Sequence, residues 1–231
     1  MKNANPVLVK SLVFIALLTG CATAPRTTRD PALLERQICG VGDGHREVKG
    51  SIWAKIDSAK VSGQFPASVL ATGTDRFEME ITNLLGAPEA TVKRKGEKLT
   101  VKAPGKQLNK ASVDPIVRGI SLDWMQKLLM GQIPCPPAAR SKISLTGEDG
   151  LLLVYSAPGI HERYQVRYRS WGGKAWAEHM EIERNLEGAP VSRFVFDFQD
   201  PEEPSGSPKN WAVAFDQGAL KVRWKDREVA R

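Results

Sequence analysis

The chain has 231 residues, 42% of them hydrophobic, and a formal net charge of +7. This length is ample for one all-β barrel or sandwich domain with its own core. The basic excess is mild and spread along the chain, without the dense stripe typical of nucleic-acid-binding proteins, so we expect no nucleic-acid partner. Such a charge is compatible with a solubilising surface, an acidic protein partner or anionic headgroups.

The first 20 residues have the composition of a secretory signal. Lys2 and Lys10 flank a weakly apolar start, and a short apolar stretch over residues 11–18 leads to the tetrapeptide Leu-Thr-Gly-Cys that ends at Cys21. The apolar stretch is too short to cross a bilayer as a mature helix. Its ending resembles a bacterial lipobox, in which Cys21 becomes the lipidated first residue. The alternative is an ordinary signal peptide with an incidental cysteine.

Lipidation of Cys21 predicts a membrane location. Two or more acyl chains, at about 0.8 kcal/mol per buried methylene, anchor a soluble domain stably. Ala22 follows the cysteine, whereas enteric bacteria use aspartate there for inner-membrane retention, so we expect an anchor on the periplasmic face of the outer membrane. Residues 21–44 would then form the lipidated N-terminus, a tether and a short helix, before a single domain over residues 45–231.

Two further cysteines, Cys39 and Cys135, are present. No Cys-x-x-Cys or Cys/His spacing surrounds them, so they do not indicate a metal site. In an oxidising compartment we expect them to form a disulfide, and two free thiols are the alternative.

Residues 75–89, with the sequence DRFEMEITNLLGAPE, are the central stretch of the chain. Apolar and polar residues alternate from Phe77 to Ile81, which indicates a half-buried antiparallel strand. The strand runs into a turn that carries Leu84 and Leu85 among Asn, Gly and Pro. Leucines at a turn tip have nothing in the turn to pack against. They either fold back under the sheet or face something apolar outside the protein.

A helical pattern interrupts the strands. Asp114-Pro115 is a start signal for a short helix that ends near Gly119. Ser121 then precedes an amphipathic helix over residues 122–130. A helix between two sets of strands is either a lid across an open barrel or a plug in an ordinary core.

The remaining segments alternate with the period of strands. Their tight connections favour an antiparallel meander or barrel wall of about ten or eleven strands over a parallel α/β sheet. Residues 200–209 are rich in Pro, Ser and acidic side chains and predict a polar loop. The expected strands cover residues 49–56, 61–71, 75–82, 89–94, 98–103, 151–155, 164–171, 174–184, 191–198, 211–215 and 220–224.

Catalytic patterns of useful specificity are missing from the sequence. There is no Gly-x-Ser-x-Gly elbow and no His-Glu-x-x-His, and His45, His161 and His179 lack metal-ligand spacing. Glu181 and Glu183 share a face of a predicted strand and imitate a paired-carboxylate site, but a solvated strand face is commoner. We therefore expect no enzymatic activity, no cofactor and no metal.

The central stretch, written as DR-F-x-x-x-x-TN-x-LG-x-x-E, resembles the protruding strand–loop–strand of the outer-membrane lipoprotein receptor family LolB. Residues 119–134, a short helix, a link and an apolar helix, are similar to the corresponding LolB segment. The resemblance covers about residues 45–200. It implies the LolA/LolB fold, which is mainly β: an incomplete, open antiparallel β-barrel with a short helical lid. In that family an exposed leucine of the loop helps to deliver lipoproteins into the membrane, and Leu85 is the matching position.

The resemblance implies a monomeric receptor that accepts the acyl chains of lipoprotein cargo from a LolA-type periplasmic carrier and releases them into outer-membrane lipid. Leu84 and Leu85 would form its membrane-insertion loop. The alternatives are a lipid-anchored scaffold of the same fold, with a filled interior and a protein partner, and, last, an anchored hydrolase. The expected lining of the acyl-chain cavity is Trp53, Leu70, Phe77, Met79, Ile81, Val101, Trp124, Met125, Leu128 and Leu129.

Overall fold

The structure, a computed structural model, describes residues 30–231, so the predicted signal segment, Cys21 and residues 22–29 lie outside the described residues. The helices are α2 (Pro31–Cys39), α3 (Lys110–Gly119), α4 (Leu122–Leu129) and the 3-10 helix η1 (Ala138–Arg140). The strands are β1 (Glu47–Asp57), β2 (Ser62–Thr72), β3 (Arg76–Thr82), β4 (Pro88–Lys95), β5 (Lys98–Lys102), β6 (Ser141–Leu145), β7 (Gly150–Ala157), β8 (Ile160–Trp171), β9 (Lys174–Leu186), β10 (Ser192–Glu202), β11 (Ser207–Phe215) and β12 (Gly218–Ala230).

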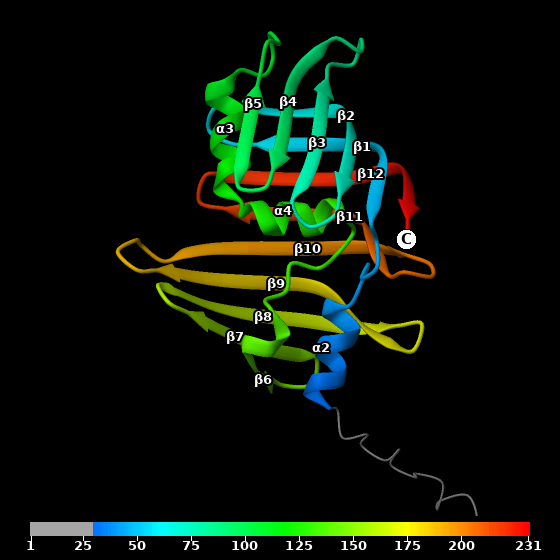
Figure 1. Ribbon diagram of the computed structural model, residues 1–231, viewed down its shortest axis with the longest axis vertical. Helices are drawn as coiled ribbons and strands as arrows, with labels where there is room; N and C mark the ends of the chain where they lie inside the picture. Colours follow the sequence, from blue (N-terminus) through cyan, green and yellow to red (C-terminus); the bar gives the residue numbers. More distant parts are fainter. Residues whose placement is uncertain (1–29) are drawn as a thin grey trace, which may run out of the picture. The chain divides into compact units, whose positions relative to one another are not determined.

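All of these strands belong to one antiparallel sheet with the order β5-β4-β3-β2-β1-β12-β11-β10-β9-β8-β7-β6. Two meanders, β1–β5 and β6–β12, are joined where the first strand pairs with the last, and β5 and β6 remain as unpaired edges. The sheet is therefore open, which confirms the expected fold class. Figure 1 shows its strong twist, with β3–β5 running steeply across the direction of β9–β12.

The alternation read from the sequence decides which face of the sheet is covered. Phe77, Met79 and Ile81 of β3 are buried, while the residues between them face outward. The inner side of β10 is aromatic, with Phe194, Phe196 and Phe198 all buried. The inner faces of the two meanders thus share one apolar core.

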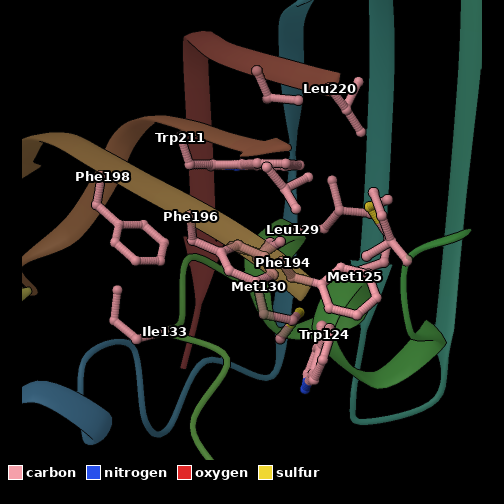
Figure 2. Packing of buried hydrophobic residues seen from close by; sticks show 14 of the residues in the cluster. Trp124, Met125, Leu129, Met130, Ile133, Phe194, Phe196, Phe198, Trp211 and Leu220 are labelled. Carbon is pink, nitrogen blue, oxygen red and sulfur yellow. The ribbon is translucent and has the colours of Figure 1, made fainter. Parts of the chain in front are cut away.

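Helices α3 and α4 connect the two edges of the sheet across its inner face (Figure 1). The apolar side of α4 is buried in the core, and Figure 2 shows Trp124, Met125 and Leu129 of this helix among the phenylalanines of β10. The apolar spacing predicted this side of the helix correctly. The space beneath α4 is filled with side chains, so the helix plugs the core in the state that the structure describes.

Helix α3 begins earlier than the sequence predicted. Asn109 and Ser112 form a reciprocal capping box, in which the Asn109 side chain accepts from the Ser112 N–H at 2.9 Å and the Ser112 hydroxyl accepts from the Asn109 N–H at 3.2 Å. Pro115 consequently lies inside the helix, and the carbonyl of Ala111, which Pro115 cannot reach with an N–H, accepts instead from the Lys60 ammonium at 3.5 Å. The predicted start at residue 114 was wrong because this cap precedes it.

Helix α2 is covalently tied to the segment after α4. The disulfide Cys39–Cys135 joins residues separated by 96 positions, with 5.6 Å between their Cα atoms. The pairing favours the disulfide over two free thiols. Leu34 of α2 is buried against the core, whereas the neighbouring Leu33 is 46% exposed.

Two strand assignments needed the tertiary structure. Strand β6 was missed because it is a short, largely exposed edge strand with little apolar contrast between its faces. The predicted loop over residues 200–209 is mostly strand, since β10 and β11 both extend into it. There Pro201 pairs with Pro208 and Glu202 with Ser207. Arg227 of β12 stabilises this polar extension, because it pairs with Glu202 and donates to the carbonyls of Ser207 and Pro208.

Candidate functional site

The turn between β3 and β4, residues 83–87, is termed the leucine loop. Leu84 is 77% exposed and Leu85 95% exposed, so neither folds back under the sheet. The loop is ordered by Asn83, whose side-chain oxygen accepts from the N–H groups of Leu85 and Ala87, each at 3.0 Å. Its backbone N–H also donates to the Ala87 carbonyl at 2.9 Å. The leucines are thus held outward by a hydrogen-bonded turn.

Glu89, the second residue after this loop, is a buried carboxylate that holds the turn in place. It is 2% exposed and accepts from the N–H groups of Gln107 at 2.8 Å and Leu108 at 3.1 Å, and from the Asn83 amide at 3.3 Å. The hydrogen bond from Leu108 is the largest cause that lowers the pKa of Glu89, and burial opposes it. The ionised form is therefore the one that the fold stabilises.

A separate cavity of about 630 Å³ lies beside α4, between this helix, the β2–β3 turn and the inner side of β7–β9. Its volume is within the range of small-molecule pockets, roughly 300–1,000 Å³. Apolar rings and charged groups both contribute to its wall. The lining includes Trp124, Gln126, Lys127, Tyr155, Ile160, Glu162, Tyr164 and Arg184.

Trp124 lies between the aromatic core and the charged part of this cavity. Its ring makes edge-to-face contacts with Phe194 and Phe196, at centroid distances of 4.9 and 5.8 Å (Figure 2). On the cavity side the Arg184 guanidinium lies 4.0 Å from the Trp124 ring centroid and pairs with Glu162 at 2.6 Å. An arginine on the face of an indole is a favourable cation–π arrangement.

The buried charges around the cavity are satisfied within the protein. The Tyr164 hydroxyl donates to Glu162, and burial is the main cause that raises the pKa of Tyr164, with Glu162 as the second. The Lys127 ammonium donates to the Cys135 carbonyl, and burial lowers its pKa. The cavity therefore has an apolar side and a polar, internally paired side, which is suited to an amphipathic guest.

Polar contacts fix α4 at its start and in its middle. The buried Arg94 of β4 donates to the Leu122 carbonyl at 2.7 Å and to the Asp123 carboxylate at 2.6 Å. The Gln126 amide donates to the carbonyls of Gly73 at 2.9 Å and Arg76 at 3.0 Å in the β2–β3 turn. Opening of the sheet's inner face would require these bonds to break.

The predicted lining residues separate into two groups. Phe77, Met79, Ile81, Val101, Trp124, Met125, Leu128 and Leu129 belong to the single buried core.

Trp53 and Leu70 were wrongly placed in the lining. Both lie on the outer face of the sheet, because each falls between buried residues of its strand. Leu70 is 43% exposed, and Trp53 lines a shallow outer groove with the Lys225 ammonium 5.6 Å from its ring centroid. Of the predicted set, Trp124 is the residue that also lines the cavity beside α4.

Sequence reasoning missed the residues that hold the site together. Glu89, Arg94 and Arg184 read as ordinary charged positions of exposed strand faces. A signal did exist for Glu162, because it precedes Tyr164 by two positions and so shares the inner face of β8. Asn83 was recognised as a turn residue, but its hydrogen bond to Glu89 was not predicted, because the sequence does not specify how the two side chains lie relative to each other.

The three histidines each have a local partner and lie in different parts of the fold. His45 contacts the Met130 carbonyl at 2.8 Å, and His161 the Ser156 hydroxyl at 2.9 Å. His179 lies between Asp197 at 2.8 Å and Glu181 at 3.4 Å. Within residues 30–231 no group of three or more His, Cys, Asp or Glu side chains could hold a metal ion. None of the helices in this part of the chain has the length and apolar content to cross a membrane.

Comparison with known proteins identifies the fold. No protein-family model and no curated protein matches the sequence. A LolA superfamily protein from Nitrosomonas europaea matches with a TM-score of 0.51 at 8% identity, over 87% of this chain and 93% of that one. A putative outer membrane lipoprotein-sorting protein domain from Vibrio parahaemolyticus matches with a TM-score of 0.50 at 9% identity, over 81% and 86%. A DUF1329 family protein from Desulfovibrio piger matches with a TM-score of 0.51 at 11% identity, over 87% and 94%. These likenesses establish a LolA/LolB-like fold and do not single out LolB.

Proposed function

We propose that this protein is an outer-membrane-anchored lipoprotein receptor. It accepts the acyl chains of lipoproteins from a LolA-type periplasmic carrier and passes them into the membrane beside its own lipid anchor at Cys21. The observation that carries this proposal is the leucine loop, in which a hydrogen-bonded turn holds two leucines in solvent. The fold shared with a lipoprotein-sorting domain supports it.

The leucine loop is energetically suited to touch a membrane without anchoring the protein there. Transfer of a leucine side chain from water to an apolar phase contributes about 1.5–3 kcal/mol. Two such side chains orient a protein that is already tethered, whereas stable anchoring takes lipid chains. Their exposure has no structural benefit in water, which favours a role in contact with something apolar.

The cavity beside α4 supplies the proposed entry point for an acyl chain. Its apolar wall is continuous with the core through Trp124, and its polar wall presents Glu162 and Arg184. A larger guest would have to displace α4, which rests on the bonds from Arg94 and Gln126. Transfer then needs no ATP, since the membrane offers acyl chains a more favourable environment than a protein cavity does.

A second candidate function is a lipid-anchored scaffold that binds a protein partner. The filled core under α4 favours it, because Trp124, Phe194 and Phe196 occupy the space that an acyl chain would need. In that case the cavity would remain small and the leucine loop would contact a protein.

A reconstituted transfer assay tests the proposal. The lipidated protein is placed in liposomes, a LolA-type carrier loaded with a lipoprotein is added, and the cargo that floats with the liposomes is measured. We expect delivery by the unchanged protein and strongly reduced delivery by Leu85→Glu. Val191→Glu is the matched control, since Val191 is an apolar loop residue that is 61% exposed elsewhere on the surface.

The outcomes separate the two candidates. Unchanged delivery by Leu85→Glu would refute the role of the loop. Absence of transfer by the unchanged protein, together with no binding of a fluorescent fatty acid, would favour the scaffold.

A further inference from the structure

The connection from the end of β5 to the start of α3 carries several lysines. Residues 102–110, termed the lysine segment, contain Lys102, Lys106 and Lys110, and all three are exposed. Between Glu97 and Asp114 the sequence has no acidic residue. The positive charge of this segment is therefore not neutralised by carboxylates within it.

The lysine segment is connected to the leucine loop through the Glu89 carboxylate of β4. One oxygen of Glu89 accepts from the N–H groups of Gln107 and Leu108 in the lysine segment, and the other accepts from the Asn83 side chain in the leucine loop. The Gly105 N–H also donates to the Glu89 carbonyl at 3.1 Å. Figure 1 shows both segments at the same end of β3–β5.

The lysine segment lies close against Glu89 of β4. A Cβ atom at Gly105 would lie 2.0 Å from a Glu89 carboxylate oxygen and 2.5 Å from the Glu89 Cα, which is shorter than any real contact. Glycine is thus required for this contact. The lysine segment is therefore held in a fixed position against Glu89, which also bonds to Asn83 of the leucine loop.

The position of Lys110 is unfavourable for the fold itself. It is the first residue of α3, where the helix dipole disfavours a positive charge, and the first turn of the helix has no acidic residue to compensate. Local stability therefore does not explain why a lysine stands there. A negatively charged partner outside the protein would explain a lysine at this position.

We propose that the leucine loop and the lysine segment together bind a bilayer that contains anionic phospholipid, with the leucines entering the acyl region and the lysines contacting lipid phosphates. This inference rests on the proposed function in that the leucine loop meets a membrane, and it adds the lipid class that the surface selects. The basis is charge complementarity, because the segment that Glu89 ties to the exposed apolar tip carries three exposed lysines. Without the predicted signal, whose charged residues are Lys2 and Lys10, the formal net charge is still +5 (7 − 2), so the protein as a whole is not repelled by an anionic membrane.

The expected effect is large enough to measure. A lysine near an anionic surface improves partitioning by about fivefold, and the effect falls off within a Debye length of about 10 Å. Three lysines acting together would contribute between about tenfold and a hundredfold. Apolar insertion of leucine does not depend on salt in this way, so the two contributions can be separated.

The test is flotation with vesicles of phosphatidylcholine alone and with vesicles that also contain phosphatidylglycerol. The protein is the chain that starts after Cys21, which retains the whole folded unit Pro31–Arg231. We expect stronger binding to the phosphatidylglycerol vesicles, reduced by added salt. The triple variant Lys102→Ala/Lys106→Ala/Lys110→Ala should lose this preference and bind both kinds of vesicle equally weakly.

The control is Lys95→Ala/Lys98→Ala, which removes two exposed lysines from the other end of the same hairpin. It should bind as the unchanged protein does. A triple variant that keeps full preference for phosphatidylglycerol would overturn the proposal, as would binding to an acidic protein but to neither kind of vesicle.

Failure of this inference is distinguishable from failure of the proposed function. If Leu85→Glu abolishes binding to both kinds of vesicle while the lysine variant changes nothing, the lysine inference is wrong and the membrane role of the leucine loop stands. If Leu85→Glu and the lysine variant both bind like the unchanged protein, both are wrong.

Discussion

Strand β3 and the leucine loop that follows it place apolar side chains in opposite environments. Phe77, Met79 and Ile81 are buried in the core, while Leu84 and Leu85, a few residues later, project into solvent. The leucines are exposed because Asn83 and Glu89 build a rigid turn, so their exposure is a specified feature of the fold. Burial stabilises this protein, and exposure at a fixed point leaves apolar surface available for a partner.

The core side of this comparison is tested most strongly at Trp124. Removal of its ring in Trp124→Ala deletes the contacts to Phe194 and Phe196 and leaves Arg184 without its aromatic partner. We expect a loss of about 3–5 kcal/mol in the free energy of unfolding, measured by urea titration. If α4 is instead a lid whose removal from the core costs little, the loss will be far smaller and binding of a fluorescent fatty acid will increase.

The disulfide is the next largest contribution on the core side. It closes a loop between Cys39 and Cys135 with a sequence separation of 96, which constrains the unfolded chain. Replacement by Cys39→Ser/Cys135→Ser should lower the free energy of unfolding by about 2–4 kcal/mol. Comparison of the oxidised and reduced forms of the unchanged protein provides an independent measurement, and equal midpoints in the two forms would contradict the prediction.

Acid should loosen the leucine loop before it unfolds the core. The pKa of Glu89 is lowered by the hydrogen bond from Leu108, so the stabilisation that Glu89 provides is complete above the ordinary pKa of glutamate. It is lost as the pH falls through the lowered value. Hydrogen-exchange protection of Leu85, Ala87, Gln107 and Leu108 should decline over that range.

Glu89→Gln gives the matched control for this pH effect. It should remove the same protection already at neutral pH, because an amide cannot accept all three donors that the carboxylate accepts. Protection in the variant equal to that in the unchanged protein would show that the backbone alone orders the loop.

The smallest effect on stability is expected at the exposed tip. Leu85→Ala should change the free energy of unfolding by no more than about 0.5 kcal/mol, whereas Ile81→Ala on the same strand–loop unit should cost about 2–5 kcal/mol. The pair is measured side by side by urea titration. A large loss for Leu85→Ala would mean that the leucine packs in the folded protein, and the contrast between β3 and the leucine loop would disappear.

The sequence predicted the fold class well because strand alternation is a local property. Phe77 to Ile81 and Phe194 to Phe198 repeat every second residue, which indicates both the strand and its buried face. Local signals failed where a partner decided the outcome. Strand β6 forms because β7 pairs with it. The start of α3 at Lys110 is a different case, because the Asn109–Ser112 capping box is a local signal that went unrecognised.

For the candidate site, the sequence by itself determined that two leucines stand at a turn tip and that α4 has one apolar side. The alternation in β1 and β2 already separates Trp53 and Leu70 from their buried neighbours, but the tertiary structure decided that the helices cover the other face of the sheet. The tertiary structure alone decided that Glu89 joins the leucine loop to the lysine segment, and that Arg94 and Gln126 hold α4 against the sheet. These contacts join residues from separate elements, and their geometry exists only once the sheet has twisted around its core.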